Sequence, residues 1–160
     1  MLIECPRLYR HLAVKDVHLV LGILALALNL LAFLVGAVAW FRRRASPLFW
    51  QLLRGGQAMV VLEALIGGVL MLMGEKAKSL HYLYGVLPLL VALMGEQLRL
   101  SAASMVLDMR GLADAQAVGK LPQAEQREVV VAIMRREIGV MTLAALVVVA
   151  LLARAATVVH

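Results

Sequence analysis

The sequence predicts an all-α integral membrane protein, with four transmembrane helices in an up-down-up-down bundle and a cytoplasmic helical hairpin that extends the last two. The chain has 160 residues and is 63% hydrophobic, with a mean hydropathy of +0.90. Apolar runs long enough to cross the ~30 Å hydrocarbon layer occur four times along it. These runs are continuous rather than alternating, which favours helices over the strands of a membrane barrel.

The predicted spans cover residues 17–41, 48–73, 80–98 and 138–158. Residues 45–47, which end in a proline, separate the first two spans, and the polar segment 74–79 separates the second from the third. Short connections force neighbouring helices to run antiparallel. We therefore expect the spans to alternate in direction within a single transmembrane domain, residues 1–160.

The third connection, residues 99–137, is long and has a different composition. It mixes charged residues with apolar ones at helical spacing, such as Met105, Met109, Val130 and Met134. Pro122 suits the first turn of a helix, and no helix breaker follows it before the fourth span. The pattern predicts a helical hairpin that continues the third and fourth helices beyond the membrane, with its turn near residues 111–121.

The positive charge indicates a membrane surface rather than nucleic acid as the partner. Lys and Arg number 16 against 10 Asp and Glu, and Arg42, Arg43 and Arg44 directly follow the first span. Ten of these 16 basic residues lie in or beside the first and third connections. Because cytoplasmic connections are enriched in Lys and Arg, we expect both connections in the cytoplasm, both termini outside, and the chain in a bacterial cytoplasmic membrane.

One pattern occurs twice, near the outer ends of the first and third spans. His18 is followed four residues later by Gly22, and His81 is followed by Gly85 in the same way. The two spans should run parallel, so both imidazoles should lie at one depth, each with a glycine one turn further in. Imidazole is the commonest metal ligand in proteins, and polar residues are costly enough in membrane helices to suggest a role.

These histidines belong to stripes of mostly small residues at alternating steps of four and three, the seam spacing of closely packed helices. The stripes are His18, Gly22, Ala25, Asn29, Ala32 and Gly36 in the first span; Gly56, Val60, Glu63, Gly67, Leu70 and Gly74 in the second; and His81, Gly85, Pro88, Ala92, Gly95 and Arg99 in the third. The fourth span is apolar on every face until Arg154. The first three spans are therefore predicted to carry the specific packing, and the fourth to close the bundle.

The paired HxxxG pentapeptides resemble those of the cytochrome b family of membrane haem bundles. The resemblance implies one b-type haem, with His18 and His81 as the axial ligands of its iron. Gly22, Gly85 and Gly67 would leave room for the macrocycle, and Tyr84 could stand beside it. A deeper second pair of histidines is missing, so the resemblance covers one haem at most. His11, two turns before His18, is a further candidate nitrogen for a small metal site.

Glu63 is the second candidate for chemistry, because it should lie near the middle of its span. Carboxylates at such a depth usually face the bundle interior and often mark proton or ion paths. Asn29 is at a comparable depth, so it could hydrogen-bond to Glu63 and form a polar site below a haem or quinone pocket. The alternative is a neutral glutamic acid that only fixes the packing register. At the cytoplasmic ends of the second and third spans, Arg54 and Glu96 should form an ion pair.

The sequence thus leaves three functions open. The first is a haem b-binding subunit for electron transfer or quinone-linked redox chemistry. The second is a non-catalytic scaffold of a larger complex, which would contact other membrane or cytoplasmic subunits through residues 99–137. The third is a small proton- or ion-handling membrane protein built on Glu63. No hydrolase or transferase motif is visible.

Overall fold

The computed structural model describes residues 5–158, with side chains from residue 14 onward, and every regular element in this range is helical. The elements are α1 (Cys5–Arg42), α2 (Pro47–Leu72), α3 (Ser79–Met109), the short α4 (Ala115–Gly119) and α5 (Gln123–Thr157). Four of them, α1, α2, α3 and α5, are long and apolar enough to cross a membrane. The predicted all-α class, with four helices of membrane length, is confirmed.

Three of the long helices end in the same hydrogen-bonded cap. After α2, the N–H of Gly74 donates to Met71 O and that of Glu75 to Leu70 O. The ends of α1 and α3 repeat this pattern, the Schellman motif, which requires a residue with positive φ just beyond the helix. That residue is Gly74 after α2, Gly111 after α3 and Arg43 after α1. The start of α2 is fixed differently, by Ser46, whose side chain accepts a hydrogen bond from Phe49 N.

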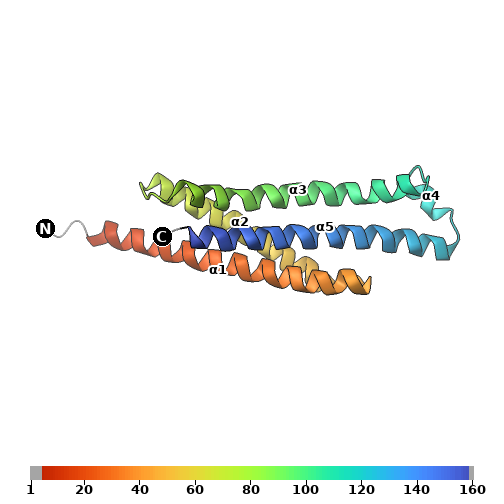
Figure 1. The fold of residues 1–160 in the computed structure, drawn as a ribbon, viewed down its shortest axis with the longest axis horizontal. Helices are drawn as coiled ribbons and strands as arrows, with labels where there is room; N and C mark the ends of the chain where they lie inside the picture. The colour runs from red at the N-terminus through yellow and green to blue at the C-terminus, as the bar shows by residue number, and fades with distance from the viewer. Residues whose placement is uncertain (1–4, 159–160) are drawn as a thin grey trace.

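Two helices extend well beyond the apolar runs. α1 begins at Cys5 rather than near residue 17, because Pro6 is tolerated in a first turn and no Gly or Pro interrupts residues 7–16. α3 continues to Met109, and α5 begins at Gln123 directly after Pro122. Figure 1 shows α3, α4 and α5 projecting past the end of α1. Hydropathy therefore marks the part of each helix suited to a membrane, and not its ends.

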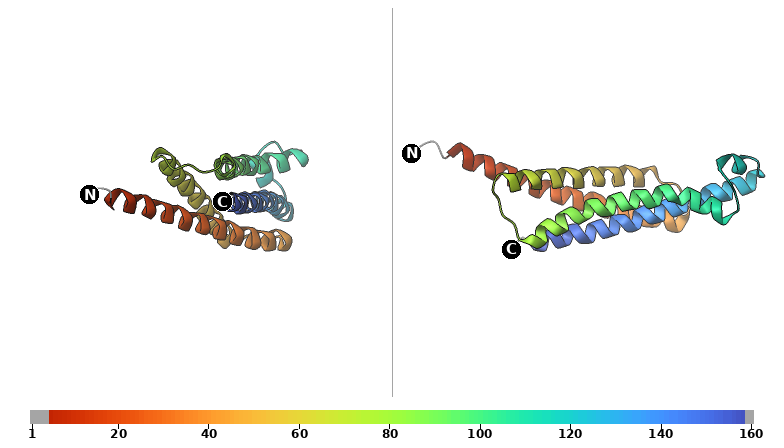
Figure 2. Two further views of the ribbon diagram at one scale, coloured as in Figure 1. Left: turned by 60° about the vertical axis from the view of Figure 1, so that its left-hand side comes forward. Right: turned by 90° about the horizontal axis from the view of Figure 1, so that it is seen from above.

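The central helix is α5, which lies between α1 and α3 (Figures 1 and 2). α2 packs on α1 and makes few contacts with α3. The expectation that the last span only closes the bundle is therefore wrong. The buried positions of α5 are Val129, Ile138, Gly139, Met141, Thr142, Ala145, Val148, Leu152 and Ala155. Because a helix buried on two sides is apolar all round, its sequence gave no sign of a preferred face.

The small-residue stripes of α1 and α2 form one antiparallel seam. A Cβ on Gly56 would lie 2.8 Å from Asn29 Nδ2, and a Cβ on Gly36 would lie 2.6 Å from Phe49 Cε2. Ala25 and Val60, one turn beyond the Asn29–Gly56 level, belong to a shared core cluster. The α3 stripe faces α5 instead, where a Cβ on Gly95 would lie 3.1 Å from Ala144 Cβ. Each glycine admits a side chain from the neighbouring helix.

Large apolar side chains cover much of the outer surface of the helices. Leu19, Ile23, Leu65 and Leu93 are all more than half exposed. In water such a surface would be an aggregation liability, whereas in a bilayer it faces lipid tails. The exposed surface thus agrees with the length and composition of the four helices in indicating a membrane protein.

Candidate functional site

Three titratable side chains from three different helices meet near one end of the molecule. Nδ1 of His18 on α1 lies 3.3 Å from Oε1 of Glu63 on α2. The ring of His18 lies 6.1 Å, centroid to centroid, from that of His81 on α3, with an angle of 72° between the ring planes. The structure thus brings together the two histidines of the HxxxG pair and adds Glu63 to them.

Glycines on the α1–α2 seam make this arrangement possible. A Cβ on Gly22 would lie 2.8 Å from Glu63 Oε1, so only glycine leaves the carboxylate its present position. A Cβ on Gly67 would lie 3.4 Å from His18 Cε1, which places that glycine against the imidazole. Gly22 therefore leaves space for the Glu63 carboxylate, and Gly67 leaves space for the His18 imidazole.

His81 is held by the end of the central helix. Its Nδ1 lies 3.2 Å from the backbone oxygen of Ala155. This carbonyl belongs to the last turn of α5, where it also accepts from Val158 N at 3.4 Å. An imidazole that carries its proton on Nδ1 can donate to it. This contact fixes the ring of His81 to α5 through Nδ1, and Nε2 takes no part in it.

Hydrogen bonding at His18 and Glu63 is incomplete in the described part of the chain. Both His18 Nδ1 and Glu63 Oε2 are buried and have no hydrogen-bond partner there. The 3.3 Å contact is close enough for an ion pair when the imidazole is protonated, but its geometry is not that of a hydrogen bond. Buried polar atoms usually have a partner. The site therefore has capacity for a proton or a further ligand.

The remaining predicted site residues lie in different surroundings. Gly85 faces open space, with nothing within 4 Å of a Cβ placed on it. The Tyr84 ring lies under Arg154, whose guanidinium carbon is 5.9 Å from the ring centroid. Cys5 and His11 belong to α1, but their side chains lie outside the described ones. Among the described side chains, no group of three or more His, Cys, Asp or Glu residues could hold a metal ion.

Asn29 does not bind Glu63, and that expectation is wrong. It is only 2% exposed, and its Nδ2 donates to the backbone oxygen of Ala25 at 2.8 Å. It packs against Gly56, whereas Glu63 packs against Gly22, two helical turns away along the same seam. The two residues lie on the same α1–α2 seam but at different levels, because each packs against a glycine on the opposite helix.

A second polar cluster lies towards the other end of the four helices. Arg54 Nη1 on α2 lies 2.5 Å from Glu96 Oε1 on α3, which confirms the predicted ion pair. Glu96 also accepts from Gln57 Nε2 at 3.1 Å and from Arg99 Nε at 2.9 Å. Arg99 in turn approaches Glu137 of α5 at 3.8 Å. The cluster joins α2 to α3 and α5, where apolar contact between α2 and α3 is scarce.

Sequence reasoning missed two contributions of α5. Ala155 offers its backbone oxygen to His81, which no side-chain pattern could reveal. Thr142 is buried and packs at Gly36, and its hydroxyl has no hydrogen-bond partner among the described residues. The available signal for Thr142 was a hydroxyl in an otherwise apolar run.

No known protein-family model, curated protein or solved structure matches the chain.

Proposed function

We propose that the chain is a membrane subunit that binds one haem b between His18 and His81, for electron transfer or quinone-linked redox chemistry. The observation that carries the proposal is the spacing of the two rings, 6.1 Å between centroids. Two imidazoles bonded at ~2 Å on opposite sides of one metal ion have centroids about 6 Å apart. The rings come from α1 and α3, so the ligand pair would join two helices that are distant in sequence.

The surroundings of the two rings fit a role as metal ligands. Metal-bound histidines usually direct their second ring nitrogen to a carboxylate or a backbone carbonyl. His18 directs Nδ1 to Glu63 at 3.3 Å, and His81 directs Nδ1 to Ala155 O at 3.2 Å. In both rings Nε2 would then be the ligating atom. The open space at Gly85 supports the fit, because a flat macrocycle needs a neighbour without a side chain.

Each residue then has a separate role. His18 and His81 would hold the iron, and bound haem would supply one-electron transfer. Glu63 orients the His18 ring and offers Oε2 to a proton, because that atom has no partner in the described chain. Ala155 O orients the His81 ring. Gly22 and Gly67 keep Glu63 and His18 in place.

The absorption spectrum of the purified protein tests the proposal. Wild type should bind one haem per chain, with a Soret band that sharpens and shifts on reduction. His18→Ala and His81→Ala should each abolish the low-spin spectrum, because one of the two residues that would hold the iron is lost. Tyr82→Phe is the matched control, since Tyr82 neighbours His81 at 6.4 Å between ring centroids and its hydroxyl accepts from Ala77 N. Colourless wild type, or an unchanged spectrum in both alanine variants, would refute haem binding.

The proposed membrane arrangement is an up-down-up-down bundle with both termini outside. The basic residues at Arg42–Arg44 and the protruding end of α3 and α5 would then lie in the cytoplasm. Cysteines introduced at Ser46 and Glu125 should react with an impermeant maleimide only from the cytoplasmic side, and Cys5 only from outside. Labelling of Cys5 from the cytoplasm would invert the arrangement.

A proton-handling role is the second candidate, favoured by the unpartnered Glu63 Oε2 beside His18. This role predicts that the wild-type protein is colourless and changes the internal pH of vesicles, and that Glu63→Gln abolishes the change.

The scaffold alternative is favoured by the protruding hairpin of α3, α4 and α5 (Figure 1). It predicts that a partner subunit is co-purified only when residues 110–122 are intact.

A further inference from the structure

Arg43 occupies a position that the other helix ends give to glycine. Among residues 5–158 it is the one non-glycine residue with positive φ, at 52°. Left-handed backbone costs L-residues free energy because Cβ approaches a carbonyl oxygen. The equivalent cap positions after α2 and α3 are Gly74 and Gly111. Strained backbone of this kind is typical of functional positions, so the side chain of Arg43 needs an explanation.

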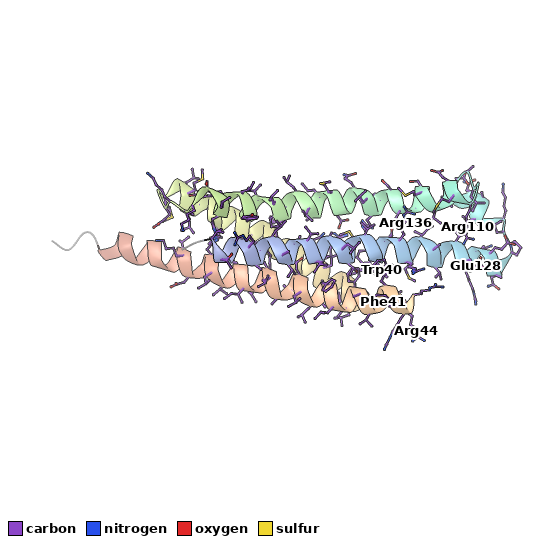
Figure 3. The ribbon with its side chains drawn as sticks, in the orientation of Figure 1. Trp40, Phe41, Arg44, Arg110, Glu128 and Arg136 are labelled. Atoms are coloured by element: carbon purple, nitrogen blue, oxygen red, sulfur yellow. The ribbon has the colours of Figure 1, made fainter. Side chains whose placement is uncertain are left out.

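The side chain of Arg43 helps to line an open hollow of about 350 Å³. Its other lining residues come from the end of α3 and from α5: Arg110, Glu128, Val131, Ala132 and Arg135. Three arginines that lie far apart in the sequence therefore share one concave surface. Figure 3 shows Arg110 and Glu128 on the hairpin at the same end of the molecule as Arg44, the neighbour of Arg43.

The charge of this hollow is not balanced from within. Glu128 is its one carboxylate, and its Oε2 lies 3.6 Å from Arg110 Nη1. The lining thus carries three positive charges and one negative charge, with an apolar floor at Val131 and Ala132. Guanidinium groups bind phosphate through paired, charge-assisted hydrogen bonds. Several arginines that converge on one concavity are suited to a phosphate group.

We infer that the Arg43–Arg110–Arg135 hollow is a binding site for a phosphate group, supplied by the headgroup of an anionic phospholipid. The position of the hollow, near the end of the apolar span of α1, favours the lipid as the source of the phosphate group. Arg43 lies two residues after Phe41 and three after Trp40, and Phe41 is 82% exposed at the end of α1. Aromatic residues at the end of an apolar span mark the headgroup level, where basic pockets between helices bind anionic lipid headgroups.

Lipid retention by the purified protein tests this site. Native mass spectrometry in detergent would count phosphatidylglycerol and phosphatidylcholine of identical acyl chains bound to each variant. Wild type should retain phosphatidylglycerol in preference. Arg43→Gln and Arg135→Gln should each weaken that retention about fivefold, the contribution of one basic residue at a membrane surface. Arg127→Gln is the matched control, because Arg127 is exposed on the same helix and does not line the hollow.

A second titration identifies the source of the phosphate. Inorganic pyrophosphate should not displace phosphatidylglycerol or raise the melting temperature of lipid-free protein. Pyrophosphate binding that depends on Arg43 and Arg135, without a preference for phosphatidylglycerol, would overturn the lipid as the occupant and assign the hollow to a soluble phosphate. Equal retention of the two lipids with no pyrophosphate binding, or an equal loss in Arg127→Gln, would overturn the site. Circular dichroism confirms that each variant is folded.

Discussion

The carboxylate of Glu63 lies directly over Gly22, so closely that a Cβ on this glycine would be 2.8 Å from Oε1. The contact explains how a polar side chain is accommodated on an apolar seam, since the missing side chain on α1 provides its space. It also links the two halves of the candidate site. Glu63 can reach His18 only because the position one turn further along α1 carries no side chain.

Gly22→Ala should therefore displace Glu63 and destabilise the protein. Overfilling a close contact costs about 1–3 kcal/mol; because the carboxylate ends a flexible side chain and alanine regains about 0.5–1 kcal/mol of helix propensity, the net cost should be at the low end of that range. Gly68→Ala is the matched control, because a Cβ there meets nothing within 4 Å. It should stabilise α2 by about 0.5–1 kcal/mol through helix propensity. Unfolding in mixed detergent micelles, followed by circular dichroism, measures both, and equal effects of the two changes would contradict the contact.

Glu63→Gln tests whether the carboxylate acts through its charge or through its shape. The amide preserves the size of the side chain, so stability should change little. In haem-loaded protein an ionised Glu63 beside His18 would strengthen the ligand and stabilise the ferric state. The substitution should then raise the midpoint potential and remove part of its pH dependence. A potential identical to wild type at every pH would assign Glu63 to packing alone.

The α1–α2 seam shows how far the sequence determines this fold. Steps of four and three identified the interface positions on both helices, and the structure places Gly22 at Glu63 and Gly56 at Asn29. The spacing alone did not fix the register, so Asn29 was assigned to Glu63 by depth. Depth counted from the ends of a span is a weak guide to contact, because an error of two turns in that count moves a residue about 10 Å along the helix.

The role of α5 could not be predicted from its composition. A helix that packs against α1 on one side and α3 on the other needs apolar residues on both, which removes the periodic signal that reveals a buried face. The contact of His81 with Ala155 O could not be predicted either, because every residue has a backbone oxygen and no side-chain pattern marks the one that is used. The histidine pair itself was identified because imidazoles are rare and costly in such helices.

The Arg54–Glu96 pair should couple α2 to α3. A double-mutant cycle with Arg54→Ala and Glu96→Gln should give a coupling of about 0.5–1 kcal/mol, the range for partly exposed pairs. The pair has two contacts, at 2.5 Å and 3.3 Å. Lys15 and Glu75 approach to 2.9 Å at a comparably exposed site and should couple less strongly, because an ammonium group lacks the two-pronged geometry of a guanidinium. A larger coupling for Lys15 and Glu75 would show that the α2–α3 contact contributes little.

Arg43 should show opposite effects on stability and on lipid binding. Arg43→Gly removes the Cβ from the left-handed cap of α1 and should stabilise the protein by about 1 kcal/mol. It also removes one of the three guanidinium groups of the hollow, so retention of phosphatidylglycerol should fall. Arg44→Gly is the control, because Arg44 has no positive φ and does not line the hollow. Unfolding in lipid-free detergent measures the first effect, and native mass spectrometry measures the second. A variant that loses stability together with lipid would show that Arg43 serves the cap rather than the hollow.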